Sequence, residues 1–112
     1  MSPVTLLFNR QRRLTRKSQF DLMYKEGIRR TSGPLLVHTR TNDLNFSRLG
    51  LSVPKRVGNA ITRNLIKRRC REAFRISQDD LPRSIDILLT IRQHEPLAMN
   101  EYATLILAGT NG

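Results

Sequence analysis

A short apolar segment near the C-terminal end of the sequence restricts the possible folds more than any other feature. Residues 84–92 contain three isoleucines and two leucines, at positions 85, 87, 88, 89 and 91. A strand with one solvated face alternates apolar and polar residues, whereas a strand buried on both faces is apolar at nearly every position. This segment therefore predicts a central strand of a sheet that is covered on both faces.

Two further strands are predicted earlier in the chain. Residues 35–40 are rich in apolar and β-branched side chains, and residues 48–53 alternate apolar with other side chains. The polar residues 41–45 separate the two strands, and Pro54 ends the second because proline has no N–H to donate. We expect these strands to pair as an antiparallel hairpin. The polar residues 29–34 break the strand pattern before the first of them.

Short helices are predicted toward both ends of the chain. The first covers about residues 16–26, with Thr15 as its N-cap and Gly27 directly after its end. The second covers about residues 101–108 and is ended by Gly109.

The strongest helix is predicted over about residues 60–77, opened by Asn59 and closed by residues 79–82. A rotation of about 100° per residue divides this helix into two faces. The apolar face, which we expect in the core, holds Ile66, Cys70, Ala73 and Phe74. The opposite face is a stripe of polar and basic residues, and it holds Asn64, Lys67, Arg68, Arg71 and Arg75.

The basic stripe indicates a partner of opposite charge. Like charges spaced i, i+4 on a helix repel one another by about a few tenths of a kcal/mol per pair. Glu72 is the only acidic residue in this helix, and it lies to one side of the stripe. A bound polyanion would remove the repulsion. The alternative is a solvated charged face, which is more typical of helices that mix both signs.

The charge of the whole chain is concentrated in its first two thirds. Lysine and arginine number 20 against 9 acidic residues, a net charge of +11. Residues 1–75 carry a net charge of +14, and residues 76–112 carry −3. Most of the basic residues are arginine, whose planar guanidinium suits phosphates and base edges. This distribution indicates a nucleic acid as partner. A membrane is not expected, because no basic amphipathic segment carries an exposed aromatic face.

Length and composition predict a single domain, residues 1–112, with a flexible basic arm at residues 1–13 and a tail at residues 109–112. The lone cysteine, Cys70, can form no internal disulfide and suits the reducing cytoplasm. No apolar run approaches the ~18 residues needed to span a bilayer. We therefore expect a cytoplasmic protein with no membrane partner.

Nothing in the sequence indicates catalysis or a metal site in the protein itself. His38 and His94 are far apart and have no motif around them, and Asp79 and Asp80 are expected in the turn that ends the central helix. A glycine-rich phosphate loop, zinc-binding spacing and HExxH are all missing from the sequence. We expect the protein to supply electrostatics and positioning rather than catalytic side chains.

A long motif spans the second predicted strand and the central helix. It reads LGLSVPKRVGNA over residues 49–60 and continues as RN, IKR and REAFR within residues 63–75. This motif resembles the signature of the bacterial ribonuclease P protein subunit. Residues 14–27 resemble the first helix of that family, and residues 86–90 resemble its last strand.

The resemblance implies a two-layer α+β fold with the element order α-β-β-β-α-β-α. The sheet would be mixed and four-stranded, with its first long strand divided near residues 32–34. The strand–helix–strand unit would cross left-handed, against the usual right-handed preference.

The resemblance also implies a function, that of a protein subunit in an endoribonuclease ribonucleoprotein. A large catalytic RNA, using Mg²⁺, would remove the 5′ leader from precursor tRNA, with one protein bound per RNA. By matching position, the contacts to the RNA subunit would be made by Arg63, Asn64, Lys67, Arg68 and Arg71. The leader would lie in a cleft formed by Phe20, Tyr24, His38, Ser52, Lys55 and Arg56.

Three features depart from the family pattern. Leu65 stands where an arginine is expected, and it lies off the predicted core face, near Ile61. His38 stands where a larger aromatic residue is frequent, and the C-terminus lacks the expected basic tail. Phe20 and Tyr24 are spaced i, i+4 on one helix face, so ordinary core packing is an alternative to a stacking role.

Two other functions remain open at this point. A structural ribosomal-type protein or RNA chaperone would share the charge but would need no leader cleft. A protein-only nuclease would cleave RNA with Mg²⁺ and without an RNA partner. Maturation of precursor tRNA by the particle reconstituted with its RNA distinguishes the first alternative, and Mg²⁺-dependent cleavage by the protein without RNA would support the second.

Overall fold

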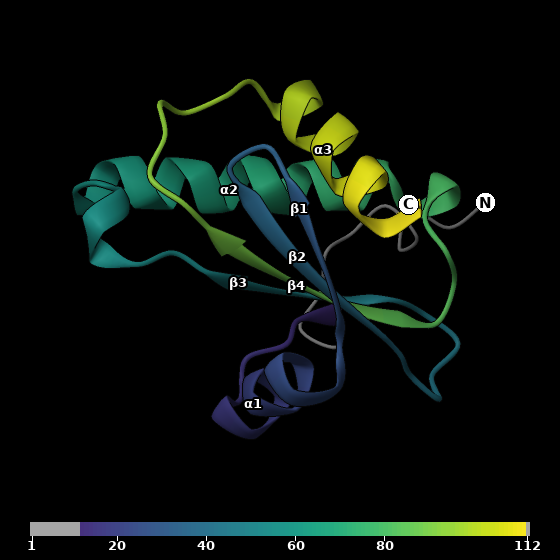
Figure 1. Cartoon of the computed structure of the whole chain (residues 1–112). Helices are drawn as coiled ribbons and strands as arrows, with labels where there is room; N and C mark the ends of the chain where they lie inside the picture. Colours follow the sequence, from purple (N-terminus) through teal and green to yellow (C-terminus); the bar gives the residue numbers. More distant parts are fainter. Residues whose placement is uncertain (1–11, 112) are drawn as a thin grey trace.

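The computed structural model describes residues 12–111, which form a four-stranded mixed sheet with helices on both faces (Figure 1). Helices α2 and α3 lie on one face, and α1 lies on the other. The elements are α1 (Lys17–Glu26), β1 (Ile28–Ser32), β2 (Leu35–Thr41), β3 (Arg48–Ser52), η3 (Lys55–Val57), α2 (Ala60–Ile76), η4 (Gln78–Asp80), β4 (Ile85–Ile91) and α3 (Met99–Asn111). The predicted α+β class and the order α-β-β-β-α-β-α are confirmed.

The strand order of the sheet is β1-β2-β4-β3. Strand β4 pairs antiparallel with β2 and parallel with β3, so the prediction of a central strand at residues 84–92 is confirmed. The prediction that β2 and β3 pair as a hairpin is wrong, because β4 lies between them. Strand β4 is apolar on both faces, so it buries the most apolar surface in the centre of the sheet. In that central position it separates β2 from β3.

Apart from Ile28, which is exposed, strand β1 is formed by polar residues that break the pattern in the sequence. It pairs antiparallel with β2 through a tight turn in which Ser32 faces Leu35 and Gly33 adopts a φ of 57°. That left-handed conformation favours glycine. The first four residues of β1 are exposed, so its backbone pairing with β2 rather than apolar burial defines this edge strand.

The larger core lies between the sheet and the α2–α3 layer. Strands β2 and β4 contribute Leu35, Val37, Ile87 and Leu89 to this core, while Tyr102 and Ile106 enter it from α3. The predicted core face of α2 is confirmed, because Ile66, Cys70, Ala73 and Phe74 are all fully buried. Burial raises the pKa of the Cys70 thiol to about 12, so the thiol stays protonated and inert.

The face of the sheet under α1 carries a smaller apolar cluster. It consists of Leu14, Met23 and Leu88, with Phe20 packed against them. A Cβ at Gly50 would lie 2.9 Å from the Leu14 Cβ and 3.1 Å from the Phe20 Cε1. A glycine at this position of β3 therefore allows α1 and the segment before it to approach the sheet.

Helix α1 begins one residue later than Thr15 predicts. Its N-cap is Arg16, and the Gln19 side chain accepts hydrogen bonds from the backbone N–H groups of Thr15 and Arg16, both at 3.0 Å. The glutamine therefore satisfies donors that a threonine cap leaves unpaired.

Helix α3 is longer than the sequence predicts, because Gly109 lies inside it instead of ending it. A Cβ at Gly109 would lie 2.7 Å from the Val37 Cγ2, so this glycine permits close contact between α3 and β2. The predicted tail at residues 109–112 is thus a helical turn as far as residue 111. Most of the predicted arm, residues 1–11, lies outside the described residues. Its last residue, Arg13, forms a parallel bridge with Leu49.

Candidate RNA interface

Helix α2 presents the basic stripe on the side away from the core. The Asn59 side chain caps the helix by accepting a 2.8 Å hydrogen bond from the Thr62 N–H, which confirms the predicted start. Asn64 and Arg68 are exposed, while Lys67 and Arg71 are partly buried. The stripe therefore offers cations at more than one depth on a single helix face.

Arg71 lies where the stripe meets the segment before α1. Burial lowers the pKa of Arg71, and the charge of Arg13 lowers it further. Both residues line a cavity of about 230 Å³ that also contains Phe20 and Thr15. Two arginines and an aromatic ring in one hollow suit a phosphate with an adjoining base.

Not every basic side chain of α2 is equally available to a ligand. Arg63 donates to the Gly58 carbonyl at 3.1 Å, and Arg69 donates to the Leu97 carbonyl at 2.7 Å. Arg75 forms an ion pair with Glu72. Arg69 therefore fastens the segment before α3, whereas Lys67, Arg68 and Arg71 carry most of the charge of the stripe.

The α1 face of the sheet brings three of the predicted leader residues together. The Tyr24 ring is 46% exposed, and its hydroxyl lies 3.2 Å from the Thr90 Oγ1. The His38 ring lies 5.0 Å from the Tyr24 ring at an angle of 85° and is only 4% exposed. Burial lowers the pKa of His38, and the charge of Arg29 adds to this effect, so the imidazole stays neutral. His38 supports Tyr24 from below, while Phe20 is partly buried beside them.

The remaining leader residues lie along and beyond β3. Ser52 faces Thr90 across the parallel pair, which puts it on the same face of the sheet as Tyr24. Lys55 and Arg56 are exposed in η3, directly after the strand. The α1 face thus combines an exposed aromatic ring and a hydroxyl, and two exposed cations follow the end of β3.

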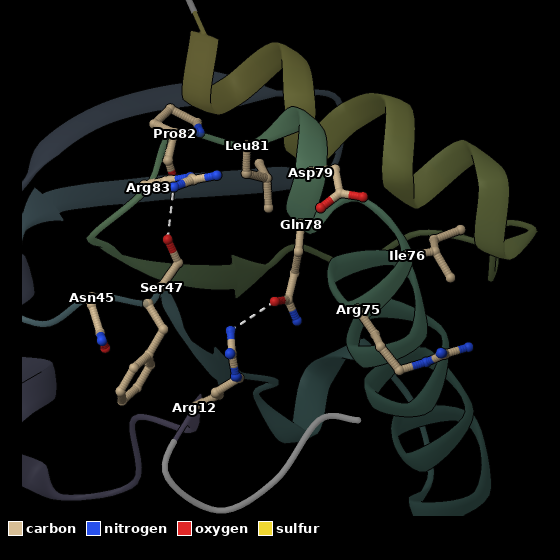
Figure 2. Close-up of a pocket in the computed structure, with 11 residues that line it drawn as sticks. Arg12, Asn45, Ser47, Arg75, Ile76, Gln78, Asp79, Leu81, Pro82 and Arg83 are labelled. Atoms are coloured by element: carbon tan, nitrogen blue, oxygen red, sulfur yellow. Dashed lines mark hydrogen bonds between the residues drawn. The ribbon is translucent and has the colours of Figure 1, made fainter. Parts of the chain in front are cut away.

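A third group of residues was missed by the sequence analysis. Figure 2 shows Arg12, Asn45, Ser47, Arg75, Gln78 and Arg83 around one hollow, and the structure gives it a volume of about 370 Å³. The lining comes from three segments that are far apart in the sequence, around residues 12, 45–47 and 75–83. No local motif connects those segments, so the sequence held no signal for this cavity.

The part of the chain that the structure describes brings no group of three or more histidine, cysteine or acidic side chains close enough to hold a metal ion. Asp79 and Asp80 lie in η4, in the turn that follows α2. Among residues 12–111, no helix is long and apolar enough to cross a membrane.

A basic helix stripe and an aromatic-bearing sheet face on one small α+β scaffold define the class of RNA-binding proteins. The family model that matches this sequence is that of ribonuclease P, and it covers residues 8–106. The chain belongs to this family. It is the protein subunit of an endoribonuclease ribonucleoprotein that processes the 5′ end of tRNA, and its partner in that particle is the RNA subunit.

Relatives and solved structures agree with this placement. The chain is 36% identical over 84 residues to the ribonuclease P protein component of Syntrophus aciditrophicus, covering 75% of this chain and 71% of that protein. It is 35% identical over 102 residues to the component from Photobacterium profundum, covering 90% and 86%. The solved RNase P protein from Thermotoga maritima superposes with a TM-score of 0.77 at 31% identity, covering 86% and 92%. The ribosomal-type alternative is therefore set aside.

Proposed function

We propose that the α2 stripe is the surface that binds the RNA subunit, through Arg63, Asn64, Lys67, Arg68 and Arg71. The support is electrostatic and geometric. Most of these side chains point away from the core, and they carry like charges that a phosphate backbone neutralises. Asn64 adds a hydrogen-bonding group within the stripe for a sugar or a base.

The α1 face would hold the 5′ leader of precursor tRNA. The observation that carries this assignment is the exposed Tyr24 ring, which contacts His38 and Thr90 on the sheet, while β3 of the same sheet leads into two exposed cations. Bases of any sequence can stack on such a ring, while phosphates find the cations. Tyr24 and Phe20 would stack, and His38 would act through Tyr24. Ser52 would donate a hydrogen bond, and the phosphates would meet Lys55 and Arg56.

The chemistry of cleavage would belong to the RNA subunit with Mg²⁺. In proteins Mg²⁺ is bound by carboxylate oxygens together with waters and phosphates. Residues 12–111 gather no cluster of acidic side chains that fits such a site. We assign the ion to the RNA, as the resemblance to the family implies, with one protein per RNA in the bacterial cytoplasm.

Reconstitution with the RNA subunit tests both surfaces in one experiment. Arg68→Ala with Arg71→Ala should weaken binding to the RNA subunit and lower the salt slope of log affinity by about 1.4–1.8 for two lost phosphate contacts. The fold should persist, because Arg68 is exposed and Arg71 is only partly buried. Wild-type affinity in this double variant would contradict the assignment of the stripe. Mg²⁺-dependent cleavage by the protein without RNA would instead support a protein-only nuclease.

A further inference from the structure

The cavity at the C-terminal end of α2 lies outside both surfaces assigned above, apart from its contact with the stripe at Arg75. It is bounded by α2, by η4 and by the loop between β2 and β3 (Figure 2). Its volume of about 370 Å³ falls in the range of small-molecule sites, which begins near 300 Å³. Its lining residues are Arg12, Asn45, Phe46, Ser47, Arg75, Ile76, Gln78, Asp79, Leu81, Pro82 and Arg83.

The walls of this cavity are held by hydrogen bonds that do not depend on a ligand. The Asn42 side chain donates to the Phe46 carbonyl at 3.3 Å and to the Asp86 carboxylate at 2.8 Å. The Ser47 hydroxyl donates to the Pro82 carbonyl at 3.0 Å, as Figure 2 shows. The loop is thereby tied to β4 and to the segment before it, so the cavity is preformed.

One buried polar group in the cavity lacks a partner. Arg12 donates to the Gln78 Oε1 at 2.7 Å, and because a guanidinium can only donate, this bond fixes which end of the amide is oxygen. The Gln78 Nε2 is therefore turned away from Arg12. It is buried and has no hydrogen-bond partner among the described residues. A buried donor of this kind calls for an acceptor, which a ligand can supply after a rotation of the Gln78 side chain, because the nitrogen has almost no accessible surface in this structure.

The remaining chemistry of the cavity combines positive charge with an apolar wall. The lining contributes three cations, Arg12, Arg75 and Arg83, and the carboxylate of Asp79, while Arg75 is also paired with Glu72 outside the lining. The Arg12 guanidinium carbon lies 5.1 Å from the centre of the Phe46 ring, so a cation already packs against this aromatic side chain. An anionic ligand with a planar apolar part matches this lining.

The cavity is continuous with the α2 stripe. Arg75 belongs to both, and it follows Arg71 by one helical turn, an axial rise of about 6 Å. An RNA strand that lies along the stripe therefore reaches the cavity without leaving the protein surface.

We propose that this cavity takes one unpaired nucleotide of the RNA subunit. The base lies against the apolar wall formed by Phe46 and its neighbours, and one of its carbonyl oxygens or ring nitrogens accepts from the Gln78 amide. The phosphate lies beside Arg75 and Arg83. This inference rests on the proposed function of the stripe and extends it from backbone contacts to the recognition of a single base.

Gln78→Glu tests the amide donor with little change in shape. Glutamate keeps an oxygen for Arg12 but replaces the donor by a negative charge, so affinity for the RNA subunit should fall by about tenfold. Gln93→Glu is the matched control, because it makes the same charge change at an exposed position in the loop between β4 and α3. It should change the affinity by less than about twofold. Equal effects of the two replacements would overturn the proposal.

A crosslinking experiment identifies the nucleotide and its source. Asn45 is exposed at the rim of the cavity, so the variant Asn45→Cys has an accessible thiol to which a photoreactive group can be attached. The native Cys70 thiol is buried, so the group attaches at this one position. The particle is then irradiated in two separate experiments, one in which the RNA subunit is labelled and one in which the precursor tRNA is labelled. A crosslink confined to one unpaired stretch of the RNA subunit supports the proposal. Crosslinks to precursor tRNA, to helical RNA or to neither RNA would overturn it.

The two proposals fail in different ways. If the Arg68 and Arg71 double variant loses affinity while Gln78→Glu and Gln93→Glu behave alike, the stripe binds RNA and only the nucleotide cavity is wrong. If the double variant binds like the wild type, the assignment of the stripe is itself wrong.

Discussion

The two faces of the sheet are packed to different depths. The face under α2 and α3 holds a continuous core in which Phe74, Ile66 and Tyr102 are fully buried. The face under α1 holds only a small cluster around Met23 and leaves nearly half of the Tyr24 ring exposed. One face therefore supplies most of the stability, and the other has polar and aromatic side chains available for a ligand.

Removal of a large side chain from the deeper face should give the largest effect. Phe74→Ala should lower the free energy of unfolding by about 3–5 kcal/mol, because it removes a fully buried ring and leaves a cavity. All RNA-binding activities should fall together as the fold is lost. Urea unfolding gives the stability. A loss below about 1 kcal/mol would mean that this face is not the stabilising one.

On the α1 face of the sheet, removal of an aromatic side chain should reduce RNA affinity rather than stability. Tyr24→Ala should lower affinity for precursor tRNA by about 1–3 kcal/mol, because a stacked base loses its platform. Thermal stability and affinity for mature tRNA should stay near the wild-type values, since the ring is half exposed.

Phe20→Ala sharpens this comparison, because Phe20 packs against the small cluster under α1. It should reduce precursor affinity and stability together, whereas Tyr24→Ala should reduce precursor affinity alone. A loss of stability in Tyr24→Ala as large as that in Phe20→Ala would place both rings in the core and contradict the stacking role.

A smaller effect is expected on the outer surface of α2. Leu65 is partly buried and contributes to neither apolar cluster. Leu65→Arg should tighten binding to the RNA subunit and steepen the salt slope of log affinity by on the order of 0.7–0.9, which corresponds to one phosphate contact. Filter binding at several salt concentrations measures this slope. An unfolded variant would mean that Leu65 contributes to the core.

The smallest effect concerns pH. Burial and the charge of Arg29 lower the pKa of His38 in the folded state, so the unfolded chain takes up a proton more readily. The contribution of neutral His38 to the free energy of unfolding is therefore complete above the unfolded pKa of about 6.5, and it declines as the pH falls below that value. His38→Phe should reduce the difference in unfolding free energy between pH 7.5 and pH 5.5. An unchanged difference would show that His38 is not responsible.

The sequence predicts those elements whose signals are local. Helix α2 has its cap at Asn59 and a repeating apolar face, and β4 is apolar throughout, so both were found within a residue or two. Pairing of β3 with β4 depends on residues nearly 40 positions apart, and no local pattern records it. Strand β1 is polar except for the exposed Ile28 and belongs to the sheet through its backbone, which side-chain periodicity does not detect.

The candidate site shows the same division. The stripe on α2 follows from helical spacing alone, and the family resemblance supplied the leader residues. The burial of His38 beneath Tyr24 could not be read from the sequence, because it depends on how α1 lies on the sheet. The cavity around Gln78 joins three distant segments and requires the tertiary structure.

The central position of β4 has a consequence for the order in which the protein is made. Strands β2 and β3 meet only through β4, which comes after three quarters of the chain. During synthesis, the ribosome releases the whole basic part, residues 1–75, before the strand that completes the sheet. Because domains complete their folding only when all their strands are available, the nascent chain exposes its cations before it has a core. The nascent chain is thus the form of this protein whose basic residues are most accessible to any nearby RNA.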